Sequence, residues 1–290
     1  MSSVRFSHRV ENWISRSVLS VLMAMPYKRR VRTMGWIFTH LLAPVAGWRR
    51  RIRDNLALAR PDLGSEEVER IVRAVPVNIG RTLIEIYSGK EFVDQVKDTP
   101  LTGPGAAALE ELHKDGIPLV LLTGHLGNYD VLRAMLYARG YPLGALYKPM
   151  SNPAFNEHYL TAIAAIGEPL FPTNREGIGG LIRHLKDGKA VGIVADVASR
   201  KAPLLSFFDQ PAHTPLSAAE WSVKYGARMI PIFGLRNPDG FTFTIHVCEE
   251  IPPGDPEEMM QTYNNVLEAI VRENMEQWYW SHRRWKRSGN

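Results

Sequence analysis

Short apolar runs, separated by segments with helical spacing, organise most of this chain. The run from 117 to 123 is almost wholly apolar and ends at Gly124, which is typical of a strand buried on both faces of a sheet. A second such run, 190–196, ends in Asp196. Three further strands are expected at 142–148, 228–235 and 241–250, the last with the alternation of an edge or antiparallel strand.

Helices are predicted between these strands from apolar spacing, capping residues and helix breakers. Ser65 begins a long helix whose apolar positions recur at helical spacing to about Tyr87. Asp255 before Pro256 marks another helix start, because Asp caps and Pro fits the first position. The remaining helices are expected at 53–60, 105–114, 128–135, 152–165, 174–187 and 214–225. Strands alternating with helices of this length predict an α/β fold, with a mostly parallel central sheet flanked by helices on both faces.

Two apolar segments near the start, 13–25 and 34–48, fall short of the roughly 18 uninterrupted apolar residues of a spanning helix. A cleaved signal peptide is not expected, because Arg16 interrupts the first segment and basic residues follow it. Both segments carry tryptophan and flank a basic run, which predicts helices lying in a membrane interface. A helical hairpin packed on the core is the alternative.

Length and composition allow a substantial core, since the chain has 290 residues and is 45% hydrophobic. We expect residues 1–50 to form N-terminal membrane-associating helices. Residues 51–290 are expected to form the α/β domain, ending in a C-terminal helix. The single cysteine, Cys248, excludes an internal disulfide and fits a reducing cytoplasm.

Charge is unevenly distributed, although 35 Lys and Arg against 30 Asp and Glu give a net charge of only +5. The stretch from Lys28 to Arg53 has eight basic residues and no acidic one, and Arg283, Arg284, Lys286 and Arg287 add a second cluster. Such clusters suit a polyanion. Because they flank apolar segments, an anionic membrane surface is favoured and nucleic acid is not expected as a partner.

The candidate chemistry begins at His125, which follows the strand that ends at Gly124. This position lies at the carboxyl edge of the sheet, where open α/β folds bind their ligands. Asn128 is expected to cap the next helix, and Asp130 to lie on the same turn as the histidine. A carboxylate there would hold one ring N–H and leave the other nitrogen free to accept a proton, as in a general base with an orienting acid. A polar loop histidine is the alternative.

Several other chemistries lack their motifs. The chain has no G-x-S-x-G elbow, no G-x-x-x-x-G-K-[ST] phosphate loop and no G-x-G-x-x-G after a strand. A metal at His125 and Asp130 would need a third ligand, and no i, i+4 histidine pair offers one. His158, His184, His213 and His246 are scattered along the chain and form no such pair. No metal and no other cofactor are therefore expected.

Five motifs together resemble the lipid A late acyltransferase family, of lauroyl and myristoyl type, within the lysophospholipid-acyltransferase-like superfamily. They are G-H-L-G-N-Y-D at 124–130, Y-K-P-M-S-N-P-A-F at 147–155, T-N-R-E-G-I at 173–178, F-F-D-Q-P-A-H-T-P-L-S at 207–217 and E-Q-W-Y-W-S-H-R-R-W-K at 276–286. Members of this family are membrane-associated bacterial enzymes that move a fatty acyl chain onto a lipid hydroxyl. The resemblance covers nearly the whole chain.

The resemblance implies an O-acyltransferase with His125 and Asp130 as the catalytic pair of an H-x-x-x-x-D motif. The expected donor is acyl carrier protein or acyl-CoA, and the expected acceptor is a lipid A precursor. The expected location is the cytoplasmic face of the inner membrane, peripheral or anchored by the N-terminal helices. Val197 stands where the family usually has glutamine, and the helix before Gly167 lacks the family's arginines. These departures leave another lysolipid, with a phosphate or amino-acid headgroup, or a non-catalytic membrane-binding relative, as alternatives.

A thioester is already activated, so the enzyme needs a base, donors for the developing oxyanion and an apolar slot for the acyl chain. Backbone N–H groups near Gly127 and Asn128 are candidate oxyanion donors, as are Lys148 and Arg175. Asp196 is expected to bind the acceptor or to brace His125, with a capping role as the alternative. The predicted substrate-binding residues are thus Asn128, Lys148, Arg175 and Asp196.

Overall fold

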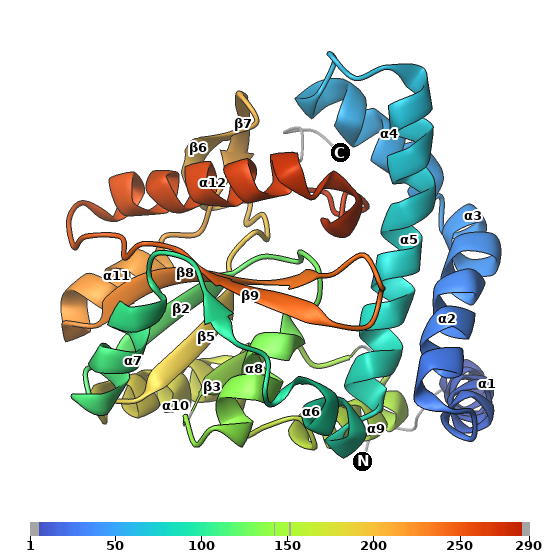
Figure 1. Cartoon of the computed structure of the whole chain (residues 1–290), viewed down its shortest axis with the longest axis horizontal. Helices are drawn as coiled ribbons and strands as arrows, with labels where there is room; N and C mark the ends of the chain where they lie inside the picture. Colours follow the sequence, from blue (N-terminus) through green and yellow to red (C-terminus); the bar gives the residue numbers. More distant parts are fainter. Residues whose placement is uncertain (1–5, 142, 151, 286–290) are drawn as a thin grey trace.

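A seven-stranded sheet in the order β1-β9-β8-β2-β5-β3-β4 crosses the molecule in the computed structural model, which describes residues 6–141, 143–150 and 152–285 (Figure 1). Its pairs are parallel except for β8 and β9. The strands are β1 (Leu101–Thr102), β2 (Leu119–Thr123), β3 (Gly144–Tyr147), β4 (Leu170–Pro172), β5 (Ala190–Val194), β8 (Arg228–Arg236) and β9 (Phe243–Val247). The predicted α/β fold with a mostly parallel sheet is confirmed.

Helices cover both faces of this sheet. In Figure 1, α12 lies above the sheet, and α6 and α8 lie below it. The helices of the sheet region are α6 (Lys90–Val96), α7 (Ala106–Lys114), α8 (Asp130–Ala138), α9 (Pro153–Ala164), α10 (Arg175–Lys186), α11 (Ser217–Tyr225) and α12 (Pro256–Glu273), and a 3₁₀ turn follows at Met275–Gln277. The starts of α12 and α10 are capped by the residues that the sequence predicted. The Asp255 carboxylate accepts hydrogen bonds from the N–H groups of Glu257 and Glu258, and the Asn174 side chain accepts one from the N–H of Gly177.

The N-terminal helices form a layer against α5, which stands at one end of the sheet (Figure 1). They are α1 (Phe6–Met23), α2 (Tyr27–Ile37), a π-helical turn (Phe38–Leu42), α3 (Ala43–Val45) and α4 (Trp48–Ala59), and α5 spans Ser65–Tyr87. The basic run 28–32 lies inside α2 and does not separate two helices, which corrects the expectation. Arg30 of that run is buried and pairs with Glu91. Among the described residues, no helix combines the length and apolar character needed to cross a bilayer. The domain boundary near residue 50 stays a prediction.

A hairpin of β6 (Leu204–Phe207) and β7 (Gln210–His213) forms a second, two-stranded sheet that the sequence pattern did not predict. Phe207 and Phe208 at its turn are buried against the tryptophans of the C-terminal segment. This cluster holds the C-terminal segment 278–285 beside the carboxyl edge of the sheet.

The central pair of strands positions the site. β2 and β5 are parallel neighbours, and their register sets Thr123 opposite Val194. Both strands end at the same edge of the sheet. His125 lies two positions after Thr123, and Asp196 lies two positions after Val194. Both side chains therefore emerge at adjacent strand ends, as expected for a ligand site of an open α/β fold.

Candidate active site

His125 and Asp196 form the central contact of the site. The Nδ1 atom of His125 lies 2.7 Å from a carboxylate oxygen of Asp196. The other oxygen of that carboxylate accepts hydrogen bonds from the His125 backbone N–H, at 2.8 Å, and from the Trp278 indole N–H, at 2.9 Å. Three donors thus hold a carboxylate that is 1% exposed, which fixes its orientation toward the imidazole.

The electrostatics keep this carboxylate ionised. Burial alone would raise the pKa of Asp196, but the charge and hydrogen bonds of His125 outweigh it and hold that pKa well below its usual range. An ionised carboxylate can only accept, so the His125 Nδ1 must carry the proton. The lone pair of the imidazole is then on Nε2, which has no hydrogen-bond partner among the described residues. The ring is 20% exposed, and the arrangement is that of a general base with an orienting acid.

Asp130 does not hold the ring, contrary to expectation. Its carboxylate is engaged by the guanidinium of Arg133 one helical turn later, at 2.8 Å. Arg133 also donates hydrogen bonds to the carbonyls of Ile163 and Gly167, at the end of α9. Asp130 therefore holds the arginine that links α8 to the end of α9. The reason lies in the turn: Asp130 is the first residue of α8, where its side chain faces Arg133 and not the strand end.

Asn128 lies beneath the site, inside a buried polar network. Its side-chain amide donates to the carboxylate of Glu85, which in turn pairs with Arg236, and its side-chain oxygen accepts from the Asp130 backbone N–H. The last contact holds the first N–H of α8, but Asn128 is not the cap that we expected, because the N-cap position is Tyr129. Because Asn128 is fully buried, the substrate contact that we expected of it is replaced by a supporting role.

The backbone N–H groups proposed as oxyanion donors are already used. The N–H of Gly127 donates to the carbonyl of Gln277, and that of Asn128 donates to the carbonyl of Gly234. This part of the expectation is wrong, because neither group is free to bind an oxyanion. Lys148 and Arg175 are exposed and follow β3 and β4 at the same edge of the sheet as His125. Their roles as substrate-binding residues stay predictions.

Three aromatic rings surround the imidazole of His125. The ring of Tyr129 lies 5.1 Å from it, that of Tyr279 5.4 Å and that of His282 4.4 Å, measured between centroids. The C-terminal segment is fixed to the histidine loop by a hydrogen bond from the Tyr279 N–H to the His125 carbonyl. From the sequence, the tail was expected to carry a family motif and a basic cluster; in the structure it also forms one wall of the site.

His282 is the functional candidate that the sequence analysis missed. Burial and the neighbouring His125 lower its pKa to about 4, so the ring is neutral at physiological pH. His282 also supplies the third ligand that was not expected from the sequence. His125, Asp196 and His282 offer donor atoms that all lie within 4.8 Å of one another, and two imidazoles with a carboxylate are a donor set that suits zinc. The short His125–Asp196 contact uses two of these donors as a hydrogen-bonded pair.

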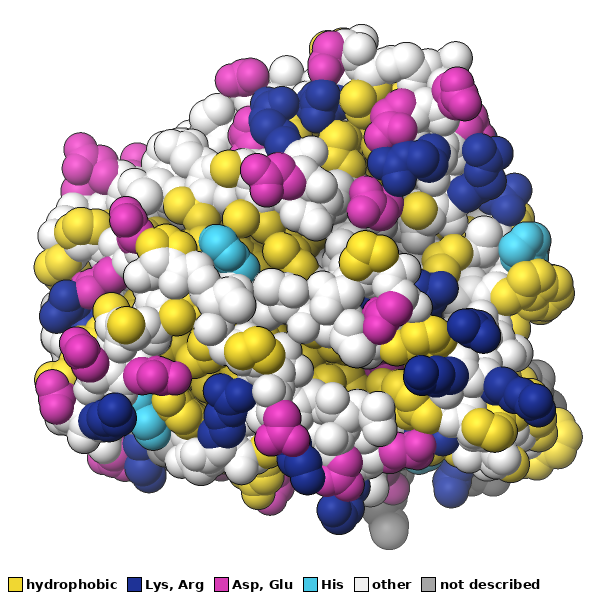
Figure 2. Space-filling model, viewed as in Figure 1, with side chains coloured by type: hydrophobic (Ala, Val, Ile, Leu, Met, Phe, Trp, Pro, Cys, Tyr) yellow, Lys and Arg dark blue, Asp and Glu magenta, His cyan; other side chains and the backbone are white. Residues whose placement is uncertain are grey.

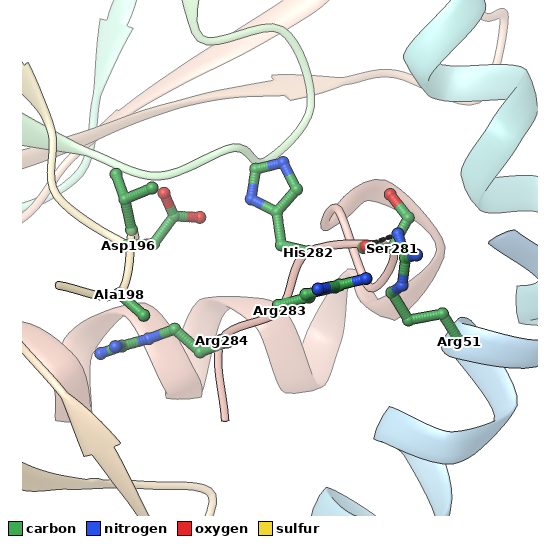
Figure 3. A pocket seen from close by; sticks show the side chains of 8 residues that line it. Arg51, Asp196, Ala198, Ser281, His282, Arg283 and Arg284 are labelled. Carbon is green, nitrogen blue, oxygen red and sulfur yellow. Dashed lines mark hydrogen bonds between the residues drawn. The ribbon is translucent and has the colours of Figure 1, made fainter. Parts of the chain in front are cut away.

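A pocket of about 320 Å³ opens beside the pair (Figure 3). It lies between the C-terminal segment, α4 and the loop after β5, and is lined by Arg51, Asp196, Val197, Ala198, Ser281, His282, Arg283 and Arg284. In Figure 3 the Asp196 carboxylate and the His282 ring face each other across one end of it. The structure thus joins the two basic clusters of the sequence, since Arg51 comes from the first and Arg283 from the second.

Fold and site together define an α/β protein in which His125, held by the Asp196 carboxylate, lies beside a basic pocket at the carboxyl edge of a mostly parallel sheet. The chain belongs to the bacterial lipid A biosynthesis acyltransferase family, whose model matches residues 2–287. It is also similar to the lipid A biosynthesis lauroyltransferase of Escherichia coli (strain K12), with 25% identity over 288 residues, covering 94% of this chain and 90% of that protein. The protein is therefore an acyltransferase, as the sequence motifs implied.

Val197, a departure from the family pattern, lies in the pocket. This residue, which stands where the resemblance leads one to expect glutamine, lines the pocket and is 47% exposed. The departure noted in the sequence therefore falls within the site, next to Asp196, and not on a remote surface.

Proposed function

We propose that this acyltransferase moves a fatty acyl chain from the thioester of acyl carrier protein or coenzyme A to a hydroxyl of a lipid A precursor. The observation that carries the proposal is the His125–Asp196 contact, which leaves one imidazole nitrogen free at the mouth of the site. Family membership and the similarity to a lauroyltransferase support the choice of substrates.

In the proposed reaction, Nε2 of His125 takes the proton of the acceptor hydroxyl while the hydroxyl oxygen attacks the thioester carbonyl. The tetrahedral intermediate then expels the thiolate, which takes that proton back from the imidazolium. The products are the ester and the free thiol of the carrier. Asp196 stays ionised throughout and stabilises the imidazolium, so it takes the role that we first gave to Asp130. Lys148 and Arg175 are the proposed donors to the oxyanion.

The test uses purified full-length protein with a labelled acyl donor and a lipid A precursor. We expect His125→Gln to lower the rate of transfer at least a thousandfold, because the base is lost. His113→Gln is the control, since His113 lies on α7 and stacks on Tyr141, away from the site. Transfer by His125→Gln at the rate of the control would refute the proposed mechanism. Comparing the lipids of strains with and without the gene would separate a lipid A acceptor from another lysolipid by mass.

We also propose that the protein works at the cytoplasmic face of the inner membrane, peripheral or anchored by its N-terminal helices. Exposed apolar side chains on α1 to α3 support this proposal, among them Trp13, Trp36 and Val45, which are 70%, 55% and 90% exposed. Figure 2 shows such side chains beside Lys and Arg along the edge of the molecule formed by the N-terminal helices. Apolar side chains next to cations are the pattern of a surface that binds anionic lipid.

A further inference from the structure

The pocket beside the histidine carries more positive charge than the acyl-transfer chemistry requires. Three arginines line it, and Asp196 is its only acidic lining residue in the part of the chain that the structure describes. The Asp196 carboxylate is already compensated, because it accepts three hydrogen bonds, two of them from His125. The remaining cations therefore lack an internal counter-charge, which indicates an anionic ligand.

Arg51 differs from its neighbours on α4 in this respect. Arg50 lies 3.8 Å from the Asp54 carboxylate, and Arg53 forms a two-pronged pair with Glu69. Arg51 forms no ion pair with any described residue, and its one protein partner is the carbonyl of Ser281, at 3.2 Å. Most of its guanidinium donors are thus free on the pocket side.

The fold fixes the position of Arg283, the second arginine that lines the pocket. Asn55, one helical turn after Arg51, donates to the carbonyls of Trp280 and His282 at 2.7 and 2.8 Å, which fastens the C-terminal segment to α4. Arg284 is buried and donates to the carbonyl of His213 and the hydroxyl of Thr214. The chain is therefore held on both sides of Arg283, an exposed residue without an ion pair among the described ones.

Arg51 and Arg283 converge on the same space. In Figure 3 their side chains extend toward each other, and Arg284 points away from them. Two guanidinium groups with free N–H donors form the fork that binds phosphate oxygens, and the neutral ring of His282 adds a further group beside them. A phosphate suits this space better than a carboxylate, because it carries more charge and three acceptor oxygens.

We propose that this pocket is a phosphate-binding subsite, in which Arg51 and Arg283 hold a phosphate of a substrate beside His125. The inference rests on the proposed function, because it gives the pocket a substrate of the acyl transfer. Two substrates carry such a group: a phosphorylated headgroup of the acceptor lipid, and the phosphopantetheine arm of the donor. The chemistry of recognition is the same for both.

Binding is tested by calorimetry on the full chain in a neutral detergent, with dodecyl phosphate as the probe and laurate as a single-charge analogue of similar chain length. We expect Arg51→Gln and Arg283→Gln each to weaken dodecyl phosphate binding about tenfold. Arg50→Gln, whose arginine points to solvent beside Asp54, should bind as the unaltered protein does. Arg283 is exposed, so its variant keeps the test valid if Arg51→Gln fails to fold. The proposal would be overturned if both variants bound dodecyl phosphate as tightly as the unaltered protein does, or if laurate bound as tightly as the phosphate.

The source of the phosphate is tested by inhibition of acyl transfer. Competition of dodecyl phosphate with a lipid A precursor would assign the subsite to the acceptor headgroup, and competition with acyl-CoA would assign it to the donor arm. Either result supports a phosphate subsite, whereas inhibition of neither kind would place the bound phosphate outside the site and overturn it. His125→Gln should keep its affinity for dodecyl phosphate while losing transfer, so a failure of the proposed reaction and a failure of the subsite give different results.

Discussion

Asp196 and Asp130 are the two carboxylates that the sequence offers as partners of His125, and their surroundings in the structure give them different roles. Asp196 is held by the His125 ring, the His125 backbone and Trp278, whereas Asp130 is held by Arg133. The carboxylate close in sequence thus holds Arg133, which links α8 to the end of α9, and the carboxylate 71 positions away orients the imidazole. Proximity along the chain was a poor guide here, because the end of one strand is closest to the end of its parallel neighbour.

Substitution of each carboxylate by its amide separates these tasks. In Asp196→Asn, the His125 backbone N–H and the Trp278 indole N–H both point at one oxygen position of the carboxylate. The amide oxygen is expected at that position, and the NH₂ group is then expected to face Nδ1 of His125. This forces the wrong imidazole tautomer, and we expect kcat to fall about 10³- to 10⁴-fold. Asp130→Asn should lower kcat far less and act mainly on the melting temperature. Rate measurements across pH, with melting curves of both variants, check this, and an equal loss of kcat would contradict the assignment.

His282 links pH to stability. Its pKa in the folded protein, about 4, lies below the ordinary value of 6.5, so the unfolded chain binds the extra proton first as the pH falls. The stability contributed by the neutral ring is therefore complete above pH 6.5 and is lost as the pH falls toward 4, by at most about 3 kcal/mol.

His282→Asn is expected to lose less stability over this pH range than the unaltered protein, because it has no proton to take up. Urea unfolding at pH 7 and pH 4.5 measures the difference. His40→Asn, at an exposed position of the N-terminal helices, is the matched control. If the two variants show the same dependence on pH, His282 is not the group responsible.

At the scale of elements, the turn between β2 and α8 depends on Gly127. The residue has a φ of +57°, and a Cβ added there would lie 2.0 Å from the carbonyl oxygen of Gly234. Its own carbonyl accepts hydrogen bonds from the buried side chains of Asn78 and Thr82. The turn therefore cannot move away from β8 without breaking that network.

Gly127→Ala is expected to destabilise the fold by about 3 kcal/mol or more, through the backbone clash and the left-handed conformation. Gly254→Ala is the control, because no atom lies within 4 Å of the position of its added Cβ and its φ is not positive. Its effect should stay within about 0.5 kcal/mol. Denaturant midpoints measure both, and similar values for the two variants would show that the turn has more freedom than its contacts indicate.

Most helices and strands could be predicted because their signals are local. Apolar runs predicted β2 and β5, and capping residues predicted the starts of α10 and α12. In the structure, Asn174 and Asp255 accept hydrogen bonds from N–H groups in the first turn of these helices, as expected. The β6–β7 hairpin was missed because its turn residues, Phe208 and Asp209, are not the glycine or asparagine usually found at positive φ. Besides this local miss, the contact of His282 with His125 was not predicted, because the two residues are distant in sequence.

At the scale of the whole molecule, the site is assembled from segments far apart in sequence. Asp196 follows β5, Arg51 lies on α4, and His282 belongs to the C-terminal segment. The sequence marked each of these segments, as a strand ending in a carboxylate, a basic cluster and a tail motif. It did not place them together, since tertiary contacts such as the β2–β5 register and the Asn55 bonds to the tail bring them to one edge.

The exposed apolar side chains on α1 to α3 belong to this scale too. These helices lie at the edge of the molecule farthest from α11 (Figure 1). Trp13→Ser with Trp36→Ser removes two of the indoles that are expected to enter the lipid headgroup region. We expect the double variant to bind vesicles of phosphatidylethanolamine and phosphatidylglycerol about tenfold more weakly, since tenfold corresponds to only about 1.4 kcal/mol. Val223→Ser, a comparably exposed apolar position on α11, should leave binding unchanged. Co-sedimentation with the vesicles measures all three proteins. Undiminished binding by the double variant would move the membrane-facing surface away from α1 and α2, and with it the direction from which a lipid hydroxyl reaches His125.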